Sequence, residues 1–424
     1  MKTGWRKVRL EEVVEITSSK RIYASDYQSE GIPFYRGKEI SEKYSGRSEV
    51  TTELFISDQK YSEIKEKFGA PETGDLLLTS VGTLGVPYVV KESETFYFKD
   101  GNLTWFRNFN DLDGKYLYYW LVSPSGKAEL MKSTIGSSQP AFTIVLLKQA
   151  QLDMPPPATQ EVIVSVLSTY DDLIENNTRR IKILEEMAKL IYREWFVEFK
   201  VPGIKLRKAT AEEKEVTGKD VFPERWEITS LAEVLSELES GSRPKGGIDA
   251  SERGVVSIGA ENIIGLGQYD FSKDKFVTRG FFENMSKGRI QSGDVLLYKD
   301  GAQIGRKSLF RDGFPHDECC INEHVFILRS KSPMTQNYLF FWLDREEMTT
   351  KIRNLNANAA QPGINQTGVK RLPIVVPDPG MMRLYEQEAN NQMHLLFNLA
   401  KQNKHLRATR DFLLPKLVSG EVEV

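Results

Sequence analysis

Gln139-Pro-Ala-Phe-Thr143 opens a stretch that runs through Lys148 to Pro155 and Pro157. Gln361-Pro-Gly-Ile-Asn365 opens the same stretch about 222 positions later, and it runs through Lys370 to Pro377 and Pro379 without a gap. The correspondence extends in both directions, pairing Trp5 with Trp226, Gly74-Asp75 with Gly293-Asp294, Gly82 with Gly301, Asn102 with Asn322, and Tyr116-Leu117 plus Trp120 with Tyr338-Leu339 plus Trp342. Solenoid repeats are shorter, at roughly 20–50 residues. The sequence therefore predicts a duplicated domain, with two similar binding heads on one molecule.

Each copy begins as a mixed α and β domain and ends in a long helix. Short apolar runs bounded by Gly and Pro, such as Ile32 to Tyr35 and Asp75 to Thr79, are typical of strands. We expect an α+β fold with four parts, which are a first mixed domain, a long helix, a second mixed domain and a second long helix, at residues 1–155, 156–204, 205–378 and 379–424. The charged segment from Lys208 to Lys219 is expected to bridge the two mixed domains.

The first long helix has apolar residues spaced alternately by four and three, a period of about 3.5 that is typical of a coiled-coil seam. Its seam is Ile163, Leu167, Tyr170, Ile174, Asn177, Ile181, Leu184, Ala188, Ile191 and Trp195. An ordinary amphipathic surface helix is the alternative, although a run of nearly 40 residues exceeds the usual length. Asn177 would set the register of the seam.

The second long helix is expected from Met381 to about Leu414, with Pro415 ending or kinking it. Its more polar seam is Tyr385, Ala389, Gln392, Leu396, Leu399, Asn403, Leu406, Arg410 and Leu413. We expect the two helices to pack antiparallel about a pseudo-twofold axis, with the domains at opposite ends. At 1.5 Å per residue each helix spans roughly 50 Å, which exceeds one turn of DNA, roughly 34 Å.

Composition and charge place few restrictions on function. The 424 residues are 40% hydrophobic and 27% charged, which is ordinary for a globular protein. No apolar run reaches the length of a membrane helix, roughly 18 residues, and Met1 to Arg6 lacks a signal-peptide core. The adjacent cysteines Cys319 and Cys320 cannot frame a disulfide scaffold, so we expect a cytoplasmic protein. With a formal net charge of −2, any DNA-binding face must be a local patch, or the protein must work beside basic partners.

Signatures of catalysis are weak throughout. The chain has no Gly-Lys-Ser/Thr phosphate loop and no Gly-x-Ser-x-Gly elbow. The densest group of potential metal ligands is His316, Asp317, Glu318, Cys319, Cys320, Glu323 and His324, whose spacing fits no standard zinc pattern. We therefore expect no catalytic or metal site, and keep a metal-dependent nuclease with its site near His316 to His324 as the alternative.

Polar residues next to glycines recur in loops at equivalent positions of the two copies. Arg, Lys, Asn and Gln can make bidentate contacts to base edges, while Ser, Thr and backbone amides suit phosphates. The side chains differ between the copies, with Arg36 against Gly259 and Ser80 against Lys299. Such differences suit two heads that read different DNA sequences, although loops are also polar simply because they are solvated.

With these residues in view, the whole chain resembles the specificity subunit of type I restriction-modification systems. The most specific matches are Gly74-Asp75-Leu-Leu-Leu with Gly293-Asp294-Val-Leu-Leu, the two Gln-Pro to Pro stretches quoted above, and the closing Leu414-Pro-Lys-Leu-Val-Ser-Gly-Glu421. The second copy departs from the usual Glu-Gln after the prolines, because Pro379 is followed by Gly-Met-Met-Arg.

The resemblance implies two target-recognition domains, at 1–155 and 205–378, separated by conserved helices that form an antiparallel coiled coil. Each domain would read one half of a split sequence in double-stranded DNA. Two methyltransferase subunits, and through them restriction subunits, would bind this subunit. The chain itself would be non-catalytic and hold no cofactor, since S-adenosylmethionine, ATP and Mg²⁺ belong to those partners. The expected DNA contacts are Arg36, Lys38, Ser80, Thr83 and Gln139 from the first domain, and Asn262, Lys299, Gln303 and Gln361 from the second. A scaffold that only clamps two protein partners is a third possibility.

Overall fold

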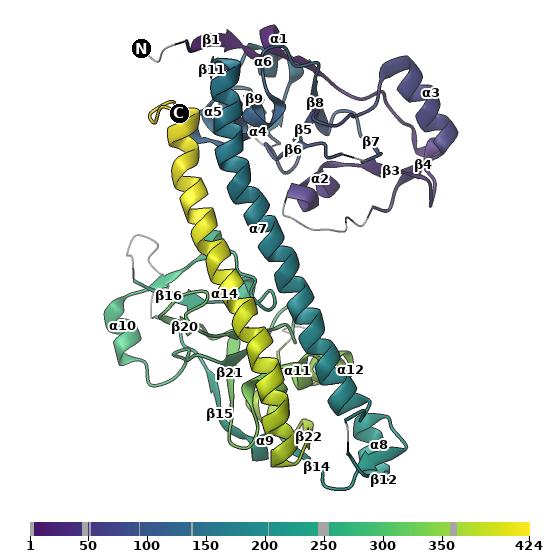
Figure 1. Ribbon diagram of the computed structural model, residues 1–424, viewed down its shortest axis with the longest axis vertical. Coiled ribbons are helices and arrows are strands. Elements are labelled where there is room, and N and C mark those ends of the chain that lie inside the picture. The colour runs from purple at the N-terminus through teal and green to yellow at the C-terminus, as the bar shows by residue number, and fades with distance from the viewer. Residues whose placement is uncertain are drawn as a thin grey trace. The chain divides into compact units, whose positions relative to one another are not determined.

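The computed structural model describes residues 4–44, 50, 52–92, 94–136, 139–201, 203–244, 254–356 and 363–424. The chain divides into two compact units, one of Met1–Glu175 with Leu406–Val424 and the other of Asn176–His405. Each long helix contributes residues to both units (Figure 1). Within the described ranges, no helix combines the length and the hydropathy that crossing a membrane requires.

The first unit is a mixed α and β domain followed by the start of a long helix. Its strands are β1 (Arg6–Arg9), β2 (Glu15–Thr17), β3 (Ile32–Tyr35), β4 (Phe55–Ile56), β5 (Leu76–Thr79), β6 (Pro87–Val89), β7 (Tyr97–Phe98), β8 (Leu103–Arg107), β9 (Thr134–Ile135), β10 (Ala141–Phe142) and β11 (Gln151–Met154). Its helices are α1 (Leu10–Val13), η1 (Ala24–Asp26), α2 (Gly37–Tyr44), α3 (Asp58–Phe68), α4 (Gly114–Val122), α5 (Pro124–Lys132), α6 (Ile144–Gln149) and α7 (Pro157–Tyr192).

The second unit repeats this plan. Its strands are β12 (Leu206–Lys208), β13 (Val221–Pro223), β14 (Glu227–Ser230), β15 (Leu235–Ser240), β16 (Val255–Ile258), β17 (Phe276–Val277), β18 (Asp294–Tyr298), β19 (Lys307–Phe310), β20 (Cys319–Ile321), β21 (Val325–Ser330) and β22 (Pro373–Val376). Its helices are η2 (Arg193–Val197), α8 (Ala211–Thr217), α9 (Leu231–Val234), η3 (Ala260–Asn262), η4 (Phe271–Lys273), α10 (Arg279–Asn284), α11 (Gln336–Asp344), α12 (Glu346–Asn354), α13 (Gln366–Lys370) and α14 (Pro379–Val418).

The two units have the same strand order. One sheet runs β2-β8-β5-β6 in the first unit and β15-β21-β18-β19 in the second, and a smaller sheet runs β4-β3-β7 and β17-β16-β20. In both smaller sheets the central strand pairs parallel with β7 or β20 and antiparallel with the other neighbour. The pair β1-β11 corresponds to β14-β22. The duplication predicted from the sequence is therefore confirmed as a duplication of topology, and the fold is α+β.

The repeated Gly-Asp pair forms the same turn in both units. Gly74 and Gly293 both have φ of +92°, a left-handed value that favours glycine. The following carboxylate accepts a backbone N–H three residues upstream, at 2.9 Å from Glu72 to Asp75 and at 2.7 Å from Gln291 to Asp294. The motif is repeated because this turn starts the buried strands β5 and β18.

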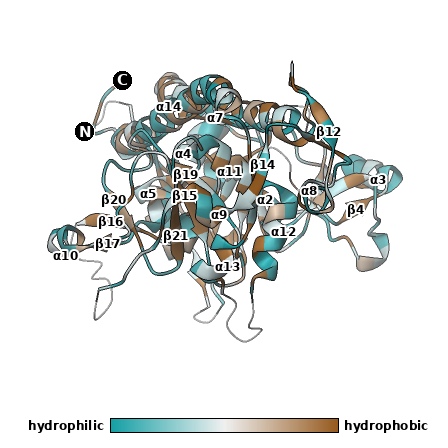
Figure 2. Ribbon diagram, turned by 90° about the horizontal axis from the view of Figure 1, so that it is seen from below, coloured by the Kyte–Doolittle hydropathy of each residue, from teal (hydrophilic) through white to brown (hydrophobic). Residues whose placement is uncertain are grey.

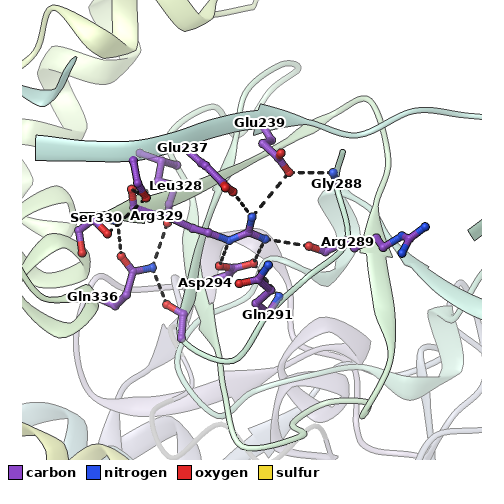
Figure 3. A network of polar contacts seen from close by, with 12 residues as sticks. Glu237, Glu239, Gly288, Arg289, Gln291, Asp294, Leu328, Arg329, Ser330 and Gln336 are labelled. Carbon is purple, nitrogen blue, oxygen red and sulfur yellow. Dashed lines mark hydrogen bonds and ion pairs between the residues drawn. The ribbon is translucent and has the colours of Figure 1, made fainter. Parts of the chain in front are cut away.

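A polar network anchors β18 to β21 inside the second unit (Figure 3). The Arg329 guanidinium donates from Nε and Nη2 to the two carboxylate oxygens of Asp294, each at 2.7 Å, and from Nη2 to the Arg289 carbonyl. It also bonds Glu237 across the β15-β21 pair. In the first unit Arg107 makes the equivalent cross-strand bond to Glu15, at 2.7 Å, but Asp75 accepts from the neutral Trp105 indole instead.

The long helices α7 and α14 pack antiparallel within each unit. In the first unit Ile163 and Leu167 share a core with Leu414, Leu417 and Val418. In the second unit late residues of α7 share a core with early residues of α14, namely Ile181, Ala188 and Tyr192 with Tyr385, Leu396 and Leu399. Figure 2 shows both teal and brown segments in the two long helices, as expected of helices with one apolar face. The alternative that α7 is an ordinary amphipathic surface helix is therefore wrong, because a second helix covers the apolar face of α7.

The remaining seam positions follow this arrangement. The α7 residues Ile174 and Asn177 are buried, and Tyr170, Leu184 and Ile191 are half-buried, as are Leu406 and Leu413 of α14. Polar pairs also cross the seam: Asn177 Nδ2 lies 3.5 Å from Gln402 Oε1, Asn403 Nδ2 lies 3.2 Å from Thr178 Oγ1, and Arg410 Nη1 lies 2.5 Å from Asp171 Oδ1.

One sequence expectation about a helix boundary needs correction. Pro415 does not end α14, which begins at Pro379 and continues to Val418. The buried side chains of Leu417 and Val418 keep the last turn helical, so the backbone hydrogen bond that Pro415 cannot donate is offset by packing. The segment from Lys208 to Lys219 has regular structure of its own, because β12 pairs with β13 around α8, whose N-terminus carries a capping box of Thr210 and Glu213.

Candidate nucleic-acid interface

In the first unit, three segments that adjoin strands β3, β5 and β8 line one hollow. Arg36, Gly37 and Lys38 follow β3, Val81 to Thr83 follow β5, and Asn102 directly precedes β8. With Glu53 they line an open hollow of about 430 Å³. The structure therefore brings together three residues predicted to contact DNA, Arg36, Lys38 and Thr83, and it adds Asn102. The sequence marked Asn102 only as a member of the repeat, paired with Asn322.

Glycines shape the loop after β5 and its counterpart after β18. Gly82 has a φ of +79° and Gly301 a φ of +84°, values that an L side chain adopts with strain. Gly85 N donates to Thr79 O at 2.9 Å, and Gly305 N donates to Tyr298 O at 3.0 Å. Both units thus carry the same tight loop, and its exposed residues include Thr83 in the first unit and Gln303 in the second.

Arg36 is held by a buried carboxylate. Glu39, whose side chain is 0% exposed, accepts from the Arg36 backbone N–H at 2.8 Å and from Nη2 at 2.8 Å, with Nε at 3.4 Å. Burial acts to raise the pKa of Glu39, but the bonds from Arg36 outweigh burial and lower this pKa below its usual value. The bond to Glu39 raises the pKa of Arg36. Both groups are therefore charged at neutral pH, and the guanidinium is fixed in orientation.

Ser80 and Gln139 differ in accessibility. Ser80 is 3% exposed, and its hydroxyl lies 2.7 Å from Thr104 Oγ1 and donates to Leu78 O at 3.2 Å. Those bonds hold the end of β5, so the Ser80 side chain does not face a ligand, and we leave it out of the proposed contact set. Gln139 is exposed, and it follows the turn at Gly136.

The second unit builds the turn after β16 with different side chains. Gly259 stands where the first unit has Arg36, and its N–H donates to Asn262 Oδ1 at 2.9 Å, just as the Arg36 N–H donates to Glu39. Asn262 is 1% exposed, and its Nδ2 is buried without a hydrogen-bond partner among the described residues. Asn262 therefore caps the turn from inside, so we also leave it out of the proposed DNA contacts.

Lys299 and His324 occupy the places of Ser80 and Asn102. Lys299 N donates to His324 O at 3.1 Å, as Ser80 N donates to Asn102 O at 2.8 Å. This bond corrects the sequence pairing of Asn102 with Asn322, because His324, like Asn102, directly precedes its strand. Lys299 is half-buried, with its ammonium 5.0 Å from the centre of the Phe326 ring. Gln361 lies outside the described residues.

The second loop cluster carries more carboxylates than the first. His324 Nδ1 lies 2.9 Å from Asp300 Oδ1, and His324 Nε2 lies 3.4 Å from Glu323 Oε1. Glu261, which follows Gly259 closely, pairs with Lys275. The first unit has Arg36 and Lys38 at the matching turn. The two units therefore share a backbone frame and present different charges on it.

The residues of the alternative metal site do not converge. His316 packs against Tyr269 and Phe271, with Nε2 3.1 Å from Asp274 Oδ2. Cys319 and Cys320 belong to different cores, and burial raises the pKa of Cys320 to about 11, which keeps its thiol neutral. In the parts of the chain that the structure describes, no three His, Cys, Asp or Glu side chains gather as metal ligands would. Nothing in these contacts favours the nuclease alternative.

The chain is similar in sequence to known proteins. Residues 2–186 match the family model described as "Type I restriction modification DNA specificity domain". The MjaIX specificity subunit of a type I restriction enzyme from Methanocaldococcus jannaschii is 25% identical over 83% of this chain and 78% of its own length. A putative type I restriction enzyme specificity subunit from Haemophilus influenzae is 29% identical over 45% of this chain and 48% of its own.

A solved structure shares the fold. The S subunit of the type I restriction-modification system from M. genitalium covers 98% of this chain and 96% of its own, with a TM-score of 0.56 and 14% sequence identity. These matches confirm the resemblance that the repeated sequence motifs indicate.

Proposed function

We propose, on the premise that this chain resembles the specificity subunits of type I restriction-modification systems, that it is the DNA sequence-recognition subunit of such a complex. Each unit reads one half of a split target in double-stranded DNA. The observation that carries this proposal is the pair of loop clusters with one backbone frame and different side chains, such as Arg36 against Gly259. A shared frame with divergent side chains suits two readers of different base sequences.

The long helices act as the ruler between the two half-sites. Both α7 and α14 are continuous and contribute to both units, and they pair antiparallel within each. A paired helix is stiffer than a loop, so it can fix the number of base pairs between the half-sites. At 1.5 Å per residue, α7 is about 54 Å long.

Catalysis belongs to partner subunits in this proposal. Two methyltransferase subunits bind the outer faces of the helices, and restriction subunits join through them. Those partners use S-adenosylmethionine, ATP and Mg²⁺, while this chain recognises the DNA sequence at which they act. Support for a docking face comes from Ile183, Met187 and Leu190 of α7, which are 54%, 47% and 58% exposed at spacings of four and three. Such a stripe on one helical face is a typical protein-binding feature.

Introducing lysines into this exposed apolar stripe of α7 should weaken binding of the methyltransferase subunit. We expect Ile183→Lys combined with Leu190→Lys to reduce the co-purified methyltransferase subunit at least tenfold, because buried interface anchors each contribute more than about 1 kcal/mol. Leu206→Lys is the matched control, since Leu206 is a similarly exposed apolar residue that belongs to β12 and not to α7. Equal co-purification of the double variant and the control would contradict this docking face.

The proposed function is tested by mapping methylated adenines at base resolution in cells with and without this gene. We expect a split motif that is methylated only when the gene is present. Restoring the gene on a plasmid should restore the same motif. Methylation that does not change when the gene is deleted would rule out the proposal, as would purified protein that cuts DNA without partners and holds stoichiometric zinc or manganese.

A further inference from the structure

We propose that Arg36 is the base-reading residue of the first unit and recognises guanine in one G·C pair of its half-site, with Glu39 as its positioning residue. The inference rests on the proposed function and deepens it. It starts from a difference between the two units: the same turn is capped by Glu39 in the first and by Asn262 in the second, and only the first places an arginine there.

Glu39 holds the guanidinium on one edge and leaves the other open. The Glu39 carboxylate accepts hydrogen bonds from Nε, Nη2 and the backbone N–H of Arg36. Among the described residues Nη1 makes no hydrogen bond, and the Arg36 side chain is 30% exposed at the hollow. A guanidinium has five N–H donors in a planar fork, so the distal edge can still donate two parallel bonds. Such a fork matches the O6 and N7 acceptors of guanine in the major groove.

The surrounding charge favours a base edge over a phosphate. Arg36 and Lys38 are balanced by two carboxylates, the buried Glu39 and the exposed Glu53, whose Oε2 lies 3.9 Å from Arg36 Nη2. A phosphate is drawn by a local excess of positive charge, which this balance removes. A guanine edge is neutral and needs correctly placed donors instead. Burial and the bonds to Glu39 fix those donors before DNA arrives, which lowers the entropy cost of binding.

The neighbours of Arg36 allow a base to approach. Gly37 is half-buried beside Thr79 and Val81, while Gly82 has open space where a side chain would begin. Thr83 and Asn102 line the same hollow. At the matching place of the second unit, the space beside Gly259 is occupied by Glu261 and Asn322. The second unit has no arginine with which to read a base in this way. The half-site of the second unit should therefore keep its base specificity in the Arg36 variants, which makes it an internal control.

The test uses the full-length protein expressed with its methyltransferase, and maps methylated sites at base resolution for Arg36→Ala, Arg36→Lys and Glu39→Gln. We expect both Arg36 variants to relax one G·C position in one half of the motif, with discrimination at that pair falling about 5- to 150-fold. Lysine keeps the charge but loses the bidentate fork, so it should relax the position nearly as much as alanine. Glu39→Gln keeps the turn but loosens the guanidinium, and should relax the same pair to a smaller extent.

Arg279→Ala removes an exposed arginine of α10 that pairs with Glu318 and lies outside the proposed contact set. It is the matched control and should leave that G·C pair strict. A phosphate role for Arg36 predicts an even loss of methylation at all sites, with Arg36→Lys close to wild type, and that result would overturn the inference. Unchanged specificity in the Arg36 variants would also overturn it. A fold defect from Glu39→Gln would relax no single base pair. Failure of the proposed function looks different, because methylation would then not depend on the gene at all.

Discussion

Replacing Asp294 with alanine is expected to destabilise the centre of the second unit while leaving the stability of the first unit unchanged. The Asp294 side chain is 2% exposed and is bonded through both oxygens to Arg329, which is itself 13% exposed (Figure 3). Removing Asp294 leaves the Arg329 guanidinium with Glu237 and Glu239 as its remaining carboxylate partners and breaks the most buried bonds of the network. Breaking a buried ion pair in this way costs about 3–5 kcal/mol. The same change removes the acceptor of the Gln291 N–H that closes the turn before β18.

Hydrogen exchange followed by mass spectrometry measures this loss locally, which suits a protein of two units better than one unfolding midpoint. Peptides that cover β18 should exchange about 150- to 5000-fold faster in the variant, the equivalent of that free energy. Peptides that cover β5 should keep their wild-type rates. Wild-type protection of β18 in Asp294→Ala would show that the pair contributes little to stability.

The internal repeat provides a matched comparison. Asp75 stands at the equivalent turn but accepts from the neutral Trp105 indole, at 2.8 Å. Asp75→Ala should therefore lower the stability of its unit by less, about 1–3 kcal/mol, since it leaves only a neutral indole N–H without its acceptor. Asp220→Ala, at an exposed pair with Lys214, should leave exchange rates unchanged.

Lengthening both helices by one matched heptad is expected to move the two half-sites apart by about three base pairs. A heptad adds about 10 Å to a helix, and base pairs rise by about 3.4 Å. The insertion must be made in both helices, because α7 and α14 run antiparallel and share cores in each unit. Tandem duplication of residues 174–180 and 399–405 keeps the seam, including the pairs of Asn177 with Gln402 and Thr178 with Asn403.

Methylome mapping reads the result as a change in the spacer of the split motif, with both half-sites retained. Duplication in α7 alone is the control. It should abolish methylation, since one helix then slips by two turns against the other and Ile163 and Leu167 lose Leu414 and Leu417. An unchanged spacer in the double insertion would show that the helices do not set the number of base pairs between the half-sites.

Much of the architecture follows from short-range patterns. The spacing of four and three along residues 163 to 195 predicts a long helix with a buried partner, because side chains three or four apart lie on one face. The repeated Gly74-Asp75 and Gly293-Asp294 predict equivalent strand starts, since few residues other than glycine adopt that φ. These features depend on neighbours in the chain, so they are visible in the sequence.

The sequence by itself determined the duplication, the long helices and the segments after β3, β5 and β18 that carry Arg36, Lys38, Thr83 and Gln303. Only the tertiary structure decided that Ser80 and Asn262 turn inward, that Glu39 grips Arg36, and that His324 rather than Asn322 takes the place of Asn102. The reason is physical. A polar residue in a loop has the same local signature whether its side chain faces solvent or caps a buried turn, and that choice depends on partners supplied by distant strands.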